Sequence, residues 1–459
     1  MAGVGFELRK MLRRETYSGV VGAYAYSALV ACGPWIISIL TLVVLNFFMH
    51  RQFSGAGKIA EIQVFAATVT HVYAFSLILV GPFGLVLTRY ASDRFSDKTP
   101  EAIFPSFMAA LTVVALAAAV VGICFFGFGV GGTLLYQISA AALMVYVCCI
   151  FITANYLTAL LDYRDVVLNF LIGYLFSGVA AYLFAGWLGM PAALFGFALG
   201  QLLLFVLLFR SLKRELGYQI HPSWEVLGYF KKFPSLVLVG LLYNLGIWID
   251  KLIFWWFSEQ HVQVSGLMYA VPEYDVGIYL SLLSIVPGMA VFFLNVETEF
   301  AEKFSAFFRR LENGGTLHQI SAARDDIARS LRAGFTALIK VQAMVTIFLA
   351  VFGWQILKVI GIGETQQGVF RVTLFGAFLL VVFLSLLTVL FYFDDRRGAL
   401  ICTAVFVVAN AGFSLLLSGH EKWFGFGFVI ASGMAMVLAG WRVNRRLADL
   451  EYQVFCRGT

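Results

Sequence analysis

The sequence predicts an all-α polytopic membrane protein with about twelve transmembrane helices, arranged as two six-helix halves with both termini in the cytoplasm. Hydrophobic residues make up 61% of the 459 positions and charged residues only 13%, whereas about a quarter of an average soluble protein is charged. A spanning helix needs about 20 mainly apolar residues, and about twelve such runs can be placed. Lys and Arg are concentrated in alternate loops, and this bias predicts the orientation of the chain in the membrane.

The predicted spans cover most of the chain and leave little room for a soluble domain. Gly33-Pro34 lies in the first span and Gly81-Pro82 in the second; because proline removes a backbone donor, both helices are expected to bend. The first apolar run is far longer than the 7–15-residue core of a signal peptide, so we expect a retained helix. The spans are 20–48, 62–87, 103–126, 134–156, 167–187, 192–209, 236–257, 276–296, 335–358, 369–391, 399–417 and 424–441.

A polar stretch between the sixth and seventh spans predicts the domain organisation. Residues 1–210 form an N-terminal six-helix half, 211–235 a cytoplasmic linker, and 236–459 the remaining six helices. The second half carries a cytoplasmic extension at 301–333, interrupted by Gly314-Gly315, and a tail at 442–459. A six-plus-six internal duplication is plausible from hydropathy. Residue identity between the halves is poor, so the duplication remains a hypothesis.

The loop charges predict that both termini are cytoplasmic. The N-terminus, the loops after even-numbered spans and the tail hold about 25 of the 32 Lys and Arg residues, which by the positive-inside rule lie in the cytoplasm. The opposite loops hold only Arg51, Lys58, Lys358, Arg371 and Lys422. The net charge of +6 follows from this bias and is no evidence of nucleic-acid binding.

The basic N-terminal segment has two open interpretations. Arg9, Lys10, Arg13 and Arg14 alternate there with apolar residues, which is typical of a short helix lying on an anionic leaflet. A basic topology anchor explains the same pattern equally well.

The seventh span contains the most conspicuous ionisable residues, Asp250 and Lys251. A charge at that depth costs roughly 2.5–3.5 kcal/mol on insertion scales and usually faces the bundle interior or a wet cavity. Tyr243 and Asn244 lie seven residues before them, on the same faces, and Trp248 lies beside Lys251. These five residues are candidates for a substrate path, where hydroxyls bind and Trp stacks on sugar faces.

The alternative interpretation of Asp250 and Lys251 is a structural ion pair that fixes helix packing. Consecutive helical residues point about 100° apart, so the two need not pair with each other. We therefore expect each to have a partner on another helix.

The other candidates are polar residues inside spans or at their ends. His71 lies within the second span, where a proton relay is conceivable but a hydrogen-bonded packing role is favoured. An acidic link after the seventh span could attract a cation at the outer mouth, or be a solvated loop. Acidic residues at the inner end of the eighth span could couple an ion, or cap a solvated helix end. The link residues are Glu259, Glu273 and Asp275, and the inner-end residues are Asn295, Glu297 and Glu299.

Known catalytic motifs are absent from the sequence. It has no GxxxxGK[ST] phosphate loop and no HExxH zinc motif, and its six cysteines show no metal-ligand spacing. We therefore expect a membrane transporter and no enzyme, with no metal and no cofactor.

Two features resemble a known family. The seventh span ends in Asp250-Lys251 and is followed by Ser265, Gly266, Tyr269 and Ala270, as in the polysaccharide-exporting branch of the multidrug/oligosaccharidyl-lipid/polysaccharide (MOP) flippase superfamily, whose fold is MATE-like. The opening GVGFELRKMLRRETYSGVVGAYAYSALVACGPWIISIL closely resembles that of inner-membrane transporters of the bacterial Pel exopolysaccharide system.

The resemblance implies a function and partners, and it implies no catalytic residues. It implies that the protein moves a hexosamine-rich polymer across the bacterial inner membrane to the periplasm and supports the biofilm matrix. The implied partners are other Pel inner-membrane proteins, one of them cyclic-di-GMP-responsive, and a cytoplasmic glycosyltransferase that uses a UDP-sugar. Two alternatives stay open: an ion-coupled antiporter of small cations or drugs with the same fold, and a membrane scaffold for the synthase complex.

Overall fold

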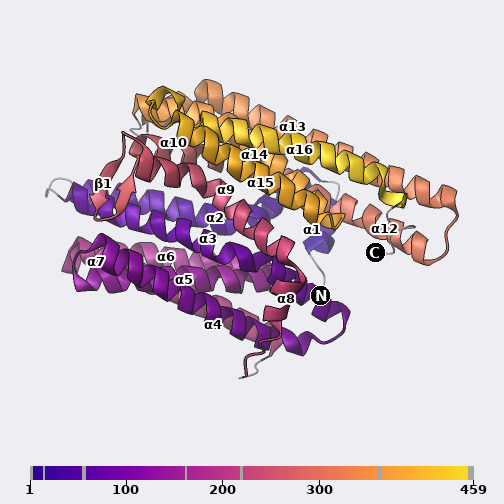
Figure 1. Ribbon diagram of the computed structural model, residues 1–459, viewed down its shortest axis with the longest axis horizontal. Coiled ribbons are helices and arrows are strands. Elements are labelled where there is room, and N and C mark those ends of the chain that lie inside the picture. Colours follow the sequence, from indigo (N-terminus) through magenta and orange to yellow (C-terminus); the bar gives the residue numbers. More distant parts are fainter. Residues whose placement is uncertain are drawn as a thin grey trace. The chain divides into compact units, whose positions relative to one another are not determined.

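The structure, a computed structural model, describes residues 4–13, 16–53, 58–160, 163–217, 221–359 and 363–452. Within these ranges, twelve helices are long and apolar enough to cross a membrane (Figure 1). The number agrees with the apolar runs of the sequence, and each predicted span falls inside one of them.

The helices exceed the predicted spans at most of their ends, because polar residues continue the helix beyond the apolar stretch. The first part of the chain forms α1 (Val4–Leu12), α2 (Tyr17–Phe53), α3 (Ile59–Ser96), η2 (Pro100–Ala102), α4 (Ile103–Gly122), η3 (Ile123–Val130), α5 (Leu134–Ala159), α6 (Tyr163–Leu188) and α7 (Met190–Leu216). The middle forms α8 (Val226–Lys232), α9 (Pro234–Phe257), β1 (Val262–Ser265), β2 (Met268–Ala270), α10 (Pro272–Leu283), α11 (Val286–Asn295), η4 (Val296–Phe300) and α12 (Ala301–Glu312). The last part forms α13 (Leu317–Val359), α14 (Glu364–Tyr392), α15 (Arg396–Leu417), η5 (Glu421–Trp423) and α16 (Phe426–Ala448).

The chain packs as two compact units that do not follow chain order. One unit is Pro34–Val271, and the other combines Met1–Gly33 with Pro272–Thr459. The chain therefore crosses between them inside α2, at Gly33-Pro34, and again just before α10. The helix α9, the seventh span, packs with α3 in the first unit. The division of the chain into six-helix halves around the linker at 211–235 stays a prediction, and so does the internal duplication of those halves.

In the unit Pro34–Val271, helices α4, α5, α6 and α7 run side by side (Figure 1), and α3 packs against both α5 and α9. The crossing of α3 and α9 requires glycine. A Cβ built on Gly240 would lie 2.1 Å from the carbonyl oxygen of Gly81, so only glycine allows the two backbones to approach this closely. Helix α3 continues through Pro82 without a break.

A β-hairpin follows α9, which the all-α prediction did not include. Strands β1 and β2 are antiparallel. The Leu267 N–H donates to the Gly129 carbonyl oxygen at 2.9 Å, at the end of η3, whose residues form a π-helix. Gly266 has a φ of +51°, and a Cβ there would lie 2.3 Å from the Gly129 oxygen. The hairpin turn thus requires glycine both for its backbone angle and for its contact with η3.

In the other unit, α13, α14, α15 and α16 run side by side (Figure 1). The charged extension predicted near residues 301–333 is helical, as α12 and the start of α13, and Gly314 turns the chain between them with a φ of +69°. The N-terminal helix α1 packs on η4. Its Leu8 is fully buried, and Arg9 lies 3.4 Å from the Glu302 carboxylate. At least part of α1 therefore faces protein.

Candidate substrate path

The buried pair on α9 is the centre of the site predicted from the sequence. Asp250 and Lys251 are 0% and 1% exposed, which confirms their predicted burial. The Lys251 Nζ lies 3.1 Å and 3.2 Å from the two carboxylate oxygens of Asp250, and it also donates to the Ile247 carbonyl oxygen at 2.8 Å. The sequence did not require the two residues to pair; they do so because the long lysine stem folds back along its own helix and brings the ammonium group to the carboxylate. A partner for each of them on another helix stays a prediction.

Aromatic rings connect this pair to His71 on α3. The Lys251 Nζ lies 5.6 Å from the centre of the Trp248 ring, a distance at which a cation is attracted to an indole face. The centres of the Trp248 and Trp255 rings are 6.3 Å apart. Trp255 in turn stacks on His71, with ring centres 4.2 Å apart and planes at 23°. The structure therefore brings His71 and the α9 candidates together, which the sequence did not reveal.

His71 is 1% exposed and lies between two aromatic rings. Trp255 covers one face, and the centre of the nearly parallel Phe125 ring lies 5.8 Å away. Its Nδ1 lies 2.9 Å from the Ala67 carbonyl oxygen, one turn earlier in α3. Its buried Nε2 has no hydrogen-bond partner among the described residues. The hydrogen bond of Nδ1 is consistent with the predicted packing role. Among the described residues, Nε2 is a buried polar atom whose hydrogen-bonding capacity is not satisfied.

Tyr243 and Asn244 occupy the first half of α9, where both are half-buried. The Asn244 side-chain nitrogen donates to the Gly240 carbonyl oxygen at 2.9 Å, and a Cβ on Gly81 would lie 3.0 Å from that nitrogen. Asn244 is therefore part of the close crossing with α3. Its place in a substrate path remains a prediction.

The acidic link is only partly a loop. Glu259 is exposed in the turn after α9, as predicted for a solvated residue. Glu273 and Asp275 are half-buried in the first turn of α10, where a negative charge interacts favourably with the helix dipole. Glu259 belongs to one unit and the other two residues to the other. A cation-attracting outer mouth remains a prediction.

The inner-end candidates lie where α11 continues into the π-helical turn η4. Asn295 donates from its side chain to the Val291 carbonyl oxygen at 2.8 Å, and its Cβ packs near Gly334 of α13. Glu297 is half-buried and Glu299 is exposed. The exposed position of Glu299 is that of a solvated helix end.

The sequence did not reveal the cluster around Asp395, which is 1% exposed and caps the N-terminus of α15. Arg442 and Arg446 of α16 donate to its carboxylate at 2.7 Å and 2.6 Å, and the Gly398 N–H donates at 3.0 Å. Burial by itself would raise the pKa of Asp395, but the hydrogen bonds from Arg446, Arg442 and Gly398 outweigh it and hold the pKa well below its ordinary value. The neighbouring Asp394 pairs with Arg396 at 2.6 Å.

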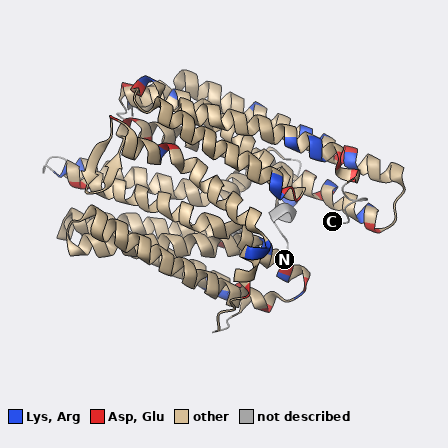
Figure 2. Ribbon diagram, viewed as in Figure 1, with Lys and Arg blue, Asp and Glu red and all other residues tan. Residues whose placement is uncertain are grey.

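Charged residues lie mostly toward the helix ends (Figure 2), so the buried pair on α9 differs from the general pattern. The family model "PelG: Putative exopolysaccharide Exporter (EPS-E)" matches residues 1–455. The chain belongs to the PelG family. With twelve apolar helices in the part of the chain that the structure describes, it is a multi-pass protein of the inner membrane.

Solved structures show the same fold as this chain. An outward-facing multidrug resistance MATE transporter of the MOP superfamily matches with a TM-score of 0.65 and 14% identity, covering 93% of this chain and 96% of that one. A MATE structure in the bent conformation matches with a TM-score of 0.63 and 14% identity, covering 94% and 96%.

A MOP superfamily transporter from Pyrococcus furiosus matches with a TM-score of 0.62 and 14% identity, covering 93% and 96%. At such identity these neighbours show the fold alone, which is that of a MATE-like transporter. A search of curated proteins finds no match.

Proposed function

We propose that this protein exports the hexosamine-rich Pel exopolysaccharide across the bacterial inner membrane and thereby supports production of the biofilm matrix. The observation that carries the proposal is the match to an exopolysaccharide exporter family over residues 1–455. The MATE-like transporter fold supports it independently. The proposed partners are the other Pel inner-membrane proteins, including a cyclic-di-GMP-responsive one, and the cytoplasmic glycosyltransferase that makes the polymer from a UDP-sugar.

Within this function, the path runs along the polar and aromatic face of α9. Asp250 and Lys251 offer a carboxylate and an ammonium group for sugar hydroxyls, and Trp248 offers an aromatic face for stacking. All three are at most 6% exposed. Substrate contact therefore requires a conformation that uncovers them, as alternating access in transporters of this kind provides.

The competing role for the pair is purely structural, and the geometry indicates how to separate the two. Removing one partner takes the adjacent opposite charge away from the other buried group, so a single substitution such as Asp250→Ala damages folding under either interpretation. Replacing both partners with neutral side chains of similar size, Asp250→Leu with Lys251→Met, removes the charges without leaving one unpaired. Such replacements are often neutral for stability.

The test compares secreted polymer in cells that carry the double variant with secreted polymer in wild-type cells, at equal amounts of inserted protein. A substrate path predicts that secretion falls at least tenfold while the protein stays folded, as judged by its elution in size-exclusion chromatography. Wild-type secretion by the double variant would assign the pair to packing. In that case the export function stands and the path must be sought on other residues.

A further inference from the structure

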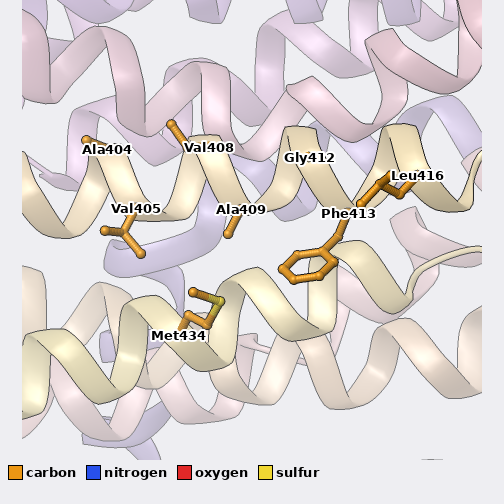
Figure 3. A pocket seen from close by; sticks show the side chains of 8 residues that line it. All are labelled: Ala404, Val405, Val408, Ala409, Gly412, Phe413, Leu416 and Met434. Carbon is orange, nitrogen blue, oxygen red and sulfur yellow. The ribbon is translucent and has the colours of Figure 1, made fainter.

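A groove between α15 and α16 is lined by none of the candidate residues above. Its volume is about 500 Å³. Figure 3 shows Val405, Ala409 and Phe413 pointing from α15 toward α16, where Met434 lies opposite them. Every residue that lines the groove is apolar: Ala404, Val405, Val408, Ala409, Gly412, Phe413, Leu416 and Met434.

The hollow follows from the size of the side chains on α15. Residues 405, 409 and 413 are neighbours along the helix, and the small Ala409 lies between two large side chains. Gly412 has open space beside it, since a Cβ there would meet no heavy atom within 4 Å. Val408 and Leu416 are 71% and 78% exposed. Because α15 is an apolar spanning helix, this exposed face borders the hydrocarbon of the bilayer.

The dimensions of the groove fit an extended hydrocarbon chain. From Ala404 to Leu416 the helix rises about 18 Å, at 1.5 Å per residue. One leaflet contributes about 15 Å, half of a hydrocarbon core that is about 30 Å thick. The groove therefore runs along α15 for about the depth of one leaflet, which is the length of an extended acyl chain.

A basic residue follows the end of the helix that carries the groove. Helix α15 ends at Leu417, and η5 follows with Lys422, which is exposed, and Trp423, which is 48% exposed. Tryptophan and lysine are typical of the membrane–water interface, and a lysine ammonium attracts anionic lipid headgroups. The apolar slot and the interfacial cation therefore lie in the order in which a phospholipid presents its tail and its phosphate.

We propose that this groove is a phospholipid-binding site, which holds one acyl chain along α15 while the lipid phosphate pairs with Lys422. A lipid held in this way fills a void that would otherwise lack contacts on one side. The site is independent of the export path, since it involves none of the α9 residues.

The experiment uses the full chain reconstituted in bilayers that contain phosphatidylglycerol with a photoreactive diazirine on one acyl chain. After irradiation, labelled peptides are mapped by mass spectrometry. The proposal predicts labelling of residues 404–416 at least fivefold above that of residues 168–183, an apolar stretch of α6 that also has exposed side chains. It further predicts that Lys422→Gln lowers the labelling of 404–416 severalfold.

A matched pair of glycine variants tests the groove itself. Gly412→Leu fills the slot and should reduce labelling of 404–416 to the level of α6. Gly186→Leu is the control, because Gly186 is also exposed on a spanning helix with no heavy atom within 4 Å of a built Cβ, and it should change nothing. If Gly412→Leu fails to insert, Ala409→Val fills the slot with two methyl groups and should have the same effect.

Two results would overturn the proposal. Equal labelling of α6 and α15 would mean that lipid contacts the groove no more than any other exposed helix face. Disulfide-linked dimers of a Gly412→Cys variant, together with no labelling of the groove by lipid, would mean that a second copy of this chain covers it.

Discussion

The Lys251 ammonium nitrogen lies 3.1 Å from the Asp250 carboxylate on the same helix, and the two side chains are 1% and 0% exposed. A buried charge is costly unless an opposite charge lies close to it, and each of these two groups supplies that charge for the other. The free energy of unfolding should therefore respond very differently to single and double substitutions at these positions.

The first prediction concerns the stability of this pair. Asp250→Ala should lower the free energy of unfolding by about 3–5 kcal/mol, because it leaves a buried ammonium group without its carboxylate. The double variant Asp250→Leu with Lys251→Met should come within about 1–2 kcal/mol of wild type. Thermal or denaturant unfolding in detergent measures both. Equal destabilisation by the single and double variants would show that the two charges do not compensate each other.

The second prediction concerns the crossing of α3 and α9. Gly240→Ala should destabilise the protein by about 1–3 kcal/mol, the usual cost of forcing extra volume into a packed site, because its Cβ would lie 2.1 Å from the Gly81 oxygen. Gly186→Ala is the control, since its Cβ meets no atom within 4 Å. Unfolding midpoints of the two variants make the comparison. A control variant as unstable as Gly240→Ala would point to a general effect of glycine replacement.

The third prediction concerns Asp395 and pH. Its pKa is held below the ordinary value by Arg446, Arg442 and the Gly398 N–H, so its stabilisation is complete above an unfolded-state pKa of about 4 and is lost as the pH falls toward the folded-state pKa. Asp395→Asn should cost on the order of 3 kcal/mol at pH 7. The difference in the free energy of unfolding between this variant and wild type should be constant from pH 5 to 8 and shrink below pH 4.

Asp394 provides the control for this measurement. Its side chain is 50% exposed and pairs with Arg396, so Asp394→Asn should change stability by less than about 1 kcal/mol. If the difference in the free energy of unfolding between wild type and Asp395→Asn stays independent of pH down to pH 2, the stabilisation does not come from an ionised Asp395 carboxylate.

The fourth prediction concerns the N-terminal helix α1. Leu8 is fully buried, whereas the pair of Arg9 with Glu302 is 41% and 57% exposed. Leu8→Ala should therefore loosen α1 far more than Arg9→Gln, because burial of a leucine contributes several times more than an exposed ion pair. Limited digestion with an arginine- and lysine-specific protease measures this. We expect faster cleavage after Lys10 in the Leu8 variant only; equal rates in both variants would indicate that α1 is not held by Leu8.

Much of this fold could be predicted from the sequence because the bilayer imposes strong constraints. A spanning helix must be long and apolar, so all twelve spans were identified. The β-hairpin was missed because its strands are only four and three residues long. The packing of α9 with α3 was missed as well, since it depends on glycines at positions 81 and 240 that hydropathy does not distinguish.

The site was less predictable because its contacts depend on side-chain conformation and on distant residues. Burial of Asp250 and Lys251 followed from their depth in an apolar run, but their mutual pairing depends on a lysine stem that folds back. The stacking of Trp255 on His71 joins positions 184 residues apart. Asp395 likewise bonds to Arg442, 47 residues later, and not to the arginine next to it in sequence.

The export of polysaccharide is the central claim, and one measurement tests it most directly. Cells that lack this protein but retain the cytoplasmic glycosyltransferase and its UDP-sugar are assayed for polymer in the medium and for polymer or precursor inside the cell. We predict that secreted polymer disappears and returns when the wild-type chain is restored. Undiminished secretion without the protein would contradict the export function.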